Sequence, residues 1–127
     1  MVIAIRPLPE QVVLVVDDDA AVCILTARIL AEAGFHVLEA HSAPSAIAML
    51  ASLSGSVQLV VSDLVMPEMT GDQLAATMAE RWPTTPILLM SGHGGPPKGY
   101  SGPFLPKPFP PELLLDAVAG LVSVPKP

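Results

Sequence analysis

Four short apolar runs constrain the fold of this chain more than any other feature, because each one stops abruptly at polar or charged residues. The runs cover residues 12–16, 57–62, 87–90 and 104–106, and they lead into Asp17-Asp18-Asp19, Asp63, Ser91 and Lys107 respectively. A continuous β-branched run such as residues 12–16 is typical of a strand buried on both faces, which occurs mainly in parallel sheets. The pattern predicts parallel strands whose carboxyl ends carry the polar side chains.

Helical patterns separate these runs. Residues 20–33 carry apolar side chains at three- and four-residue spacing, and Gly34 follows as a stop signal. The apolar stripe of this helix is formed by Val22, Leu25, Ile29 and Ala33. Further helices are predicted from the N-cap Ser42 to about residue 53, over 71–81 and from 111 onward, with a short strand at 35–40. Alternating strands and helices predict an α/β, doubly wound sheet with right-handed crossovers.

The domain organisation follows from length and from the position of the patterns. A chain of 127 residues fits one domain with a real hydrophobic core. We expect a Pro-bearing leader at 1–10, the domain at 11–122 and a tail or linker at 123–127. No internal repeat or second domain is indicated.

Composition excludes several functions. The net charge is −6 with six Lys and Arg in total, which leaves no basic face for direct nucleic acid binding. Residues 41–62 lack charge but contain six serines, so membrane insertion is not expected. The single Cys23 cannot form an internal disulfide, and the N-terminus is too short for a signal peptide. We therefore expect a cytoplasmic protein.

The polar strand ends predict a shared site. In a parallel sheet the carboxyl ends of the strands lie on one edge, where ligands of α/β proteins bind. Clustered carboxylates repel one another and need a cation, and an all-oxygen site suits Mg²⁺ (or Mn²⁺). A hydroxyl from Ser91 and an ammonium from Lys107 would bind phosphoryl oxygens. This leaves Asp63 as a nucleophile that forms an aspartyl phosphate.

Four segments together resemble the response regulator receiver domain of two-component signalling. They are residues 15–19 (VVDDD), 63–71 (DLVMPEMTG), 89–92 (LMSG) and 107–109 (KPF). The resemblance covers residues 11 to about 122 and implies a flavodoxin-like five-stranded parallel sheet of strand order 2-1-3-4-5. That order is a property of the family and not something that the periodicity predicts.

The resemblance also implies an acceptor and a metal site. Asp63 would accept a phosphoryl group from a phosphohistidine on a histidine kinase or histidine phosphotransfer protein. Asp17 and Asp18 would hold Mg²⁺ together with Asp63 and the backbone carbonyl of Val65. Such a domain is a signalling module that assists its own phosphorylation and dephosphorylation, not a turnover enzyme.

Further roles implied by the resemblance concern switching. Ser91 would hydrogen-bond a phosphoryl oxygen and draw in the loop after the fourth strand, and Lys107 would pair with the phosphoryl group or with Asp63. The Lys107–Pro108 peptide is typically cis in this family. Phe104 occupies the position of an aromatic switch residue, without the hydroxyl of the more usual Tyr.

The chain departs from the family between Ser91 and Phe104. Eight of these twelve residues are Gly or Pro, and seven of the fifteen prolines lie between Pro96 and Pro111. The family places its fourth helix here, but this composition predicts that the helix is absent or reduced to one turn. Many receivers dimerise through the face built on that helix, so the oligomeric state is left open.

Partner docking is expected on the first helix, because receivers in hybrid histidine kinases and phosphorelays dock there. Cys23, Ile24 and Ala27 lie off the predicted buried stripe, so we expect them to form an exposed apolar patch for a partner helix. His93, two residues after Ser91, is a candidate for orienting the water that hydrolyses the phosphoryl group; Val65 has no such capacity.

Two alternative functions remain at this point. A haloacid-dehalogenase-type phosphatase also uses a strand-end Asp, a Ser or Thr, a Lys and Mg²⁺. That class needs further acids after the lysine, and here only Glu112 and Asp116 follow Lys107, both on the last predicted helix. The second alternative is a degenerate receiver that binds partners without being phosphorylated.

Overall fold

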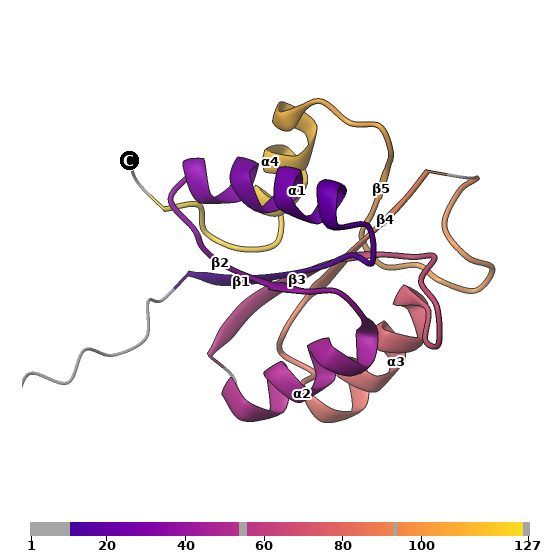
Figure 1. Ribbon diagram of the computed structural model, residues 1–127. Coiled ribbons are helices and arrows are strands. Elements are labelled where there is room, and N and C mark those ends of the chain that lie inside the picture. The colour runs from indigo at the N-terminus through magenta and orange to yellow at the C-terminus, as the bar shows by residue number, and fades with distance from the viewer. Residues whose placement is uncertain (1–10, 54–55, 93, 126–127) are drawn as a thin grey trace, which may run out of the picture.

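The computed structural model describes residues 11–53, 56–92 and 94–125 (Figure 1). In chain order the elements are β1 (Val12–Val16), α1 (Ala20–Glu32), β2 (His36–Ala40), α2 (Ala43–Leu53), β3 (Val57–Asp63), α3 (Gly71–Arg81), β4 (Ile87–Ser91), β5 (Phe104–Pro106) and α4 (Pro111–Ala119). The predicted alternation of strands and helices is confirmed.

The five strands form one sheet in the order β2-β1-β3-β4-β5, and every neighbouring pair is parallel. The flavodoxin-like order implied by the family resemblance is therefore confirmed. Because all strands run the same way, their carboxyl ends lie along one edge of the sheet. β5 is an edge strand, where Pro106 costs no ladder hydrogen bond to a further strand.

Helices cover both faces of the sheet (Figure 1). α1 and α4 pack on one face with Val13 and Val15 of β1, and α2 and α3 pack on the other with Val12, Leu14 and Val16. Successive side chains of a strand point to opposite faces, so β1 supplies both hydrophobic cores. This explains why the run at 12–16 is apolar at every position.

The helix starts are fixed by local hydrogen bonds near the carboxyl edge. The Asp19 side chain caps α1 by accepting from the backbone N–H groups of Ala21 and Val22. The Ser42 hydroxyl accepts from the N–H of Ser45 at the start of α2. Gly71 opens α3 so close to the sheet that a Cβ there would collide with the Asp63 carbonyl oxygen.

The segment between β4 and β5 contains no helix among its described residues, 92 and 94–103. The predicted loss of this helix is confirmed. A turn closed by the Tyr100 N–H on the Pro97 carbonyl replaces it, with Gly99 at φ +85°. The Tyr100 hydroxyl donates to the Pro103 carbonyl at 2.8 Å, which also accepts from the Leu89 N–H of β4. The segment between β4 and β5 is thus hydrogen-bonded to the start of the β4–β5 ladder through the Pro103 carbonyl.

The predicted buried stripe of α1 is wrong in part: Ile29 and Ala33 do pack, partly buried, against the core, but the fully buried positions are others. The buried residues are Cys23, Thr26, Ala27 and Leu30, while Leu25 is 59% exposed. The predicted docking patch is accordingly corrected: of its three members Ile24 alone is exposed, since Cys23 and Ala27 lie in the core. The first helix is apolar around most of its circumference, so spacing alone could not select the buried face.

Two parts of the predicted organisation lie outside the described residues, namely the leader at 1–10 and the last two residues of the tail. Their assignment as leader and linker stays a prediction. Within the described residues, no helix combines the length and apolar character needed to cross a membrane.

Candidate functional site

The polar strand ends meet around one cavity at the carboxyl edge of the sheet. Its volume is about 340 Å³. The lining residues are Asp17, Asp18, Asp19, Val22, Asp63, Val65, Ser91, Gly92 and Lys107. Residues at the carboxyl ends of β1, β3, β4 and β5 are therefore brought together, as the parallel sheet predicts.

Three of the four aspartates that line this cavity lie close together. Oxygen atoms of Asp17, Asp18 and Asp63 lie within 4.8 Å of one another. Asp17 is fully buried, Asp63 is partly buried and Asp18 is exposed. An all-oxygen set that is open to solvent on one side fits a hard divalent cation, which keeps some of its own waters. These residues therefore suit Mg²⁺.

Lys107 provides the positive charge of the cavity. Its Nζ lies 3.1 Å from Asp17 Oδ2 and 3.2 Å from Asp63 Oδ1. One ammonium thus bridges the carboxylates at the ends of β1 and β3. With Asp18 counted, three carboxylates face one ammonium, so the site retains an excess of negative charge.

The charges shift the pKa values of this group. Burial, together with the nearby Asp17 carboxylate, raises the pKa of Asp63 above its ordinary value, and the opposing effect of Lys107 is smaller in sum. Burial alone would lower the pKa of Lys107, but the carboxylates of Asp17 and Asp63 outweigh it and raise that pKa. Asp63 is consequently a carboxylate whose charge is poorly solvated, and lysine stays protonated.

Backbone hydrogen bonds fix the two bridged carboxylates. Asp17 Oδ1 accepts from the Asp19 N–H at 2.9 Å, and Asp63 Oδ1 accepts from the Leu64 N–H at 3.0 Å. The Leu64 N–H also reaches the Met90 carbonyl at 2.8 Å, so the end of β3 is held against β4. These two hydrogen bonds of the Leu64 N–H hold the Asp63 carboxylate in its orientation toward the cavity.

Ser91 and Lys107 are joined through the backbone. Ser91 is 2% exposed at the end of β4, and its carbonyl accepts from the Lys107 N–H at 2.8 Å. The Lys107–Pro108 peptide is cis, as the resemblance implies. Phe104 pairs with Leu89 across the ladder and is partly buried. A role of Ser91 and Phe104 in switching stays a prediction.

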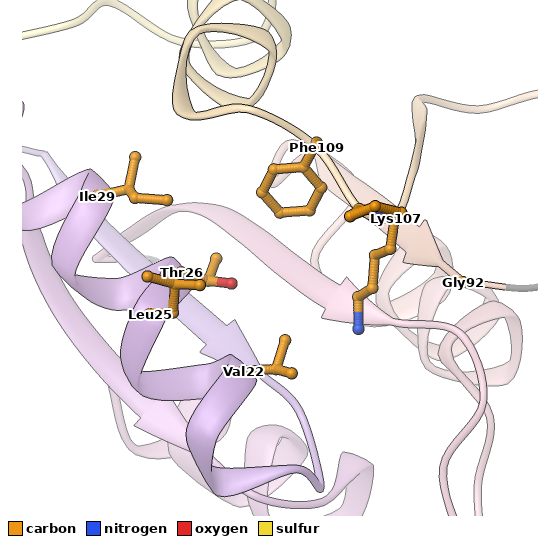
Figure 2. A pocket seen from close by; sticks show the side chains of 8 residues that line it. Val22, Leu25, Thr26, Ile29, Gly92, Lys107 and Phe109 are labelled. Carbon is orange, nitrogen blue, oxygen red and sulfur yellow. The ribbon is translucent and has the colours of Figure 1, made fainter.

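An apolar groove adjoins the acidic cavity (Figure 2). It has a volume of about 410 Å³ and lies between α1 and the segment that follows β5. The groove is lined by Val22, Leu25, Thr26, Ile29, Gly92, Lys107, Pro108 and Phe109. Val22, Gly92 and Lys107 line both spaces, so the groove opens directly beside the carboxylates.

The sequence predicts Lys107 of this groove as a site residue, but it does not predict the apolar wall. Ile29 packs partly buried against the core as its spacing predicts, whereas Leu25 is exposed, and Phe109 enters the sequence analysis only within the KPF segment. An aromatic residue two positions after a functional lysine, outside any predicted helix, was the available signal. Val65 lies beside the cavity with 63% of its surface exposed. His93 lies outside the described residues, so its suggested part in hydrolysis stays a prediction.

Fold and site together define a receiver of two-component signalling. Over 103 residues the chain is 37% identical to the sensor kinase CckA of Brucella abortus, a match that spans 76% of this chain and 11% of CckA. The crystal structure of the receiver domain from the hybrid histidine kinase CckA superimposes with a TM-score of 0.76 and 30% identity, covering 87% of this chain and 98% of that chain. The Vibrio cholerae chemotaxis protein CheY4 gives a TM-score of 0.78 and 29% identity, over 90% and 100% of the two chains.

Residues 13–119 match the response regulator receiver domain family. The chain therefore belongs to that family, whose members are signalling modules. This family assignment rules out the alternative of a haloacid-dehalogenase-type phosphatase. Because the chain spans 11% of the CckA sequence, the activity of that whole kinase is not carried over to it.

Proposed function

We propose that this domain is a phosphoacceptor in a two-component system or phosphorelay and that Asp63 takes the phosphoryl group. The observation that carries the proposal is the double contact of Lys107 with Asp17 and Asp63 beside a third carboxylate. One cavity would then hold the nucleophile Asp63, the ammonium of Lys107, and the acids Asp17 and Asp18, which would bind a metal ion. Such a constellation suits phosphoryl transfer, where positioning and charge neutralisation do most of the work.

The transfer step follows from the geometry. An Asp63 carboxylate oxygen attacks the phosphorus of a phosphohistidine, an O–P bond forms, and the N–P bond breaks. The electron pair of that bond stays on the imidazole nitrogen, which then takes up a proton from solvent. Burial of Asp63 leaves its carboxylate poorly solvated, which favours attack over hydration. Lys107 and Ser91 line the same cavity as Asp63, which supports the proposal that their ammonium and hydroxyl groups would bind the phosphoryl oxygens.

Asp17, Asp18, Asp63 and the backbone carbonyl of Val65 would hold Mg²⁺ (or Mn²⁺). When bound, the cation neutralises charge on the phosphoryl oxygens. The exposed Asp18 leaves the solvent side of the site accessible for exchange of water and cation.

The experiment that tests the acceptor is intact-mass analysis after incubation with acetyl phosphate. With Mg²⁺ we expect one phosphoryl adduct, and with EDTA none. Asp63→Asn should abolish the adduct while circular dichroism confirms an unchanged fold. A folded wild-type chain that never acquires the adduct would establish the degenerate receiver instead.

The donor side of the proposal is a histidine-bearing helix that docks in the groove between α1 and Phe109. A phosphohistidine must approach Asp63 from the open side of the cavity, and the groove begins at that opening. Large apolar side chains are also exposed in the first half of α1, near the start of α4 and after β3. They are Ile24 (50% exposed), Leu25 (59%), Val65 (63%) and Leu113 (50%).

These apolar residues suit a helix face of the partner, because their burial would stabilise a complex that the small acidic cavity alone could not hold. Leu25 and Phe109 line this groove, whereas Ile24, the exposed member of the predicted patch, lines a separate cavity together with Arg28 and His36. The parent protein would then be a hybrid kinase or a phosphorelay component, in keeping with the similarity to CckA.

A further inference from the structure

His41 extends the β1–β2 ladder by one side-chain hydrogen bond. The last backbone rung joins the Asp17 N–H to the Ala40 carbonyl at 3.1 Å. One residue further on, His41 Nδ1 lies 3.3 Å from the Asp17 carbonyl oxygen. Because a carbonyl oxygen only accepts, Nδ1 carries the hydrogen in this bond. Asp17 is thus tied to the end of β2 through both its N–H and its C=O.

The carbonyl that His41 binds belongs to the peptide that joins Asp17 to Asp18. The orientation of this peptide plane sets the direction in which Asp18 leaves β1. The Asp17 side chain has its own anchors, namely the Asp19 N–H and Lys107. The Asp18 side chain has no hydrogen bond or ion pair with another described residue, so its placement rests on the backbone.

His41 is itself well placed to act as a fixed donor. It stands between the end of β2 and Ser42, whose hydroxyl and carbonyl accept from the Ser45 and Ala46 N–H groups at the start of α2. The backbone is therefore held on both sides of the imidazole. The ring donates to the Asp17 carbonyl, which receives no backbone N–H from β2 because that strand ends at Ala40.

We propose that His41 is a positioning residue for the divalent-cation site, acting by holding the Asp17–Asp18 peptide so that the Asp17, Asp18 and Asp63 oxygens stay together. The inference rests on the proposed function, since it assigns a support to that same site. Supports of this kind commonly change metal affinity by about 10- to 100-fold when removed. The bond of His41 is long, partly exposed and made to the backbone, so we expect its removal to have an effect at or below the lower limit of that range.

The test is a Mg²⁺ titration of the whole chain by isothermal titration calorimetry at one pH. His41→Leu keeps the bulk of the side chain and removes the donor, whereas His41→Asn keeps an N–H group on the same side-chain position as Nδ1. We expect His41→Leu to weaken Mg²⁺ binding by about 3- to 10-fold and His41→Asn to stay within about 2-fold of wild type. His36→Leu is the matched control, because His36 is exposed at the other end of β2.

The outcomes separate the two proposals. Wild-type protein that binds no Mg²⁺ would overturn the cation site of the proposed function. Wild-type binding with an unchanged affinity in His41→Leu would overturn the inference about His41 and leave the site intact. Equal weakening in the Leu and Asn variants would also overturn it, because the hydrogen bond would then not be the cause.

Discussion

Lys107 Nζ lies 3.2 Å from Asp63 Oδ1, although 44 residues separate the two in the chain. The contact links the carboxyl ends of β3 and β5 across the intervening β4. The same ammonium also reaches the fully buried Asp17 at 3.1 Å. Lys107 therefore compensates two carboxylates whose mutual repulsion would otherwise act against the fold.

Replacing Lys107 should lower the stability of the fold, because the two carboxylates would lose their positive partner. Lys107→Met leaves the Asp17 charge buried without its partner, and we expect a loss of about 1–2 kcal/mol in the free energy of unfolding without Mg²⁺. The value is set below that of a fully buried pair because the Lys107 side chain is 19% exposed. Added Mg²⁺ should narrow the difference, since the cation supplies the missing positive charge. Urea unfolding with and without Mg²⁺ measures this, and Lys98→Met in the β4–β5 connection is the control.

The raised pKa of Asp63 predicts a pH-dependent stability. Burial raises this pKa above its ordinary value of 3.8, so the folded protein binds the proton more tightly than the unfolded chain. The protonated side chain contributes stability below pH 3.8, and that contribution is lost as the pH rises through the higher folded pKa. Asp63→Asn should therefore be the more stable protein at neutral pH in Mg²⁺-free buffer.

Chemical denaturation at a series of pH values checks this prediction. The stability advantage of Asp63→Asn should shrink as the pH falls toward 3.8. Mg²⁺ should reduce the advantage at neutral pH, because it binds the wild-type carboxylate. An advantage that is the same at every pH would show that the charge of Asp63 is not its origin.

The strands and the acidic site were predictable from the sequence because both depend on abrupt local changes. Each apolar run stops at a polar residue, and the parallel arrangement then fixes where Asp17, Asp63 and Lys107 meet. The strand order was available only through the family resemblance. Nothing in the spacing of the runs says which strand lies beside which.

The buried face of α1 was not predictable in this way. Its residues are apolar nearly all round, so two neighbouring stripes fit helical spacing about equally well. Packing decided between them, because the small Cys23 and Ala27 fit against the sheet, with Cys23 Sγ 3.9 Å from the Val15 carbonyl oxygen. The larger Leu25 lines the groove opposite Lys107, Pro108 and Phe109, which come from a distant part of the chain.

The thiol of Cys23 offers a direct check on this corrected face. Burial, aided by the nearby Glu39 carboxylate, raises its pKa to about 12. At neutral pH we expect iodoacetamide to alkylate the folded protein at least about 100-fold more slowly than the urea-unfolded chain. Mass spectrometry follows the reaction. Rapid labelling of the folded protein would contradict the burial of Cys23 and show that its thiol is accessible to solvent.

The connection that replaces the fourth helix should depend on Gly102. A Cβ at this position would lie 2.5 Å from the Tyr100 hydroxyl oxygen, whereas a Cβ at Gly95 would meet nothing within 4 Å. Gly102→Ala should displace the ring and lose its exposed bond to Pro103, at a cost of at most about 1 kcal/mol. Gly95→Ala is the matched control. Urea unfolding gives the cost, and faster amide exchange at Leu89 would locate it at the β4–β5 ladder.

Docking of a histidine-bearing helix should depend on Leu25. Leu25→Asp places a charge on the wall of the apolar groove without touching the carboxylates, so phosphotransfer and small-donor labelling should separate. With a phosphorylated histidine phosphotransfer protein that labels the wild-type chain, we expect transfer to slow by at least about 10-fold, which corresponds to about 1.4 kcal/mol. Labelling by acetyl phosphate should stay within about 2-fold of wild type. Val124→Asp, on an exposed apolar residue after α4, is the control and should alter neither rate. Equal slowing of both reactions in Leu25→Asp would mean that the substitution damages the acidic site, and the groove would lose its assignment as the docking surface.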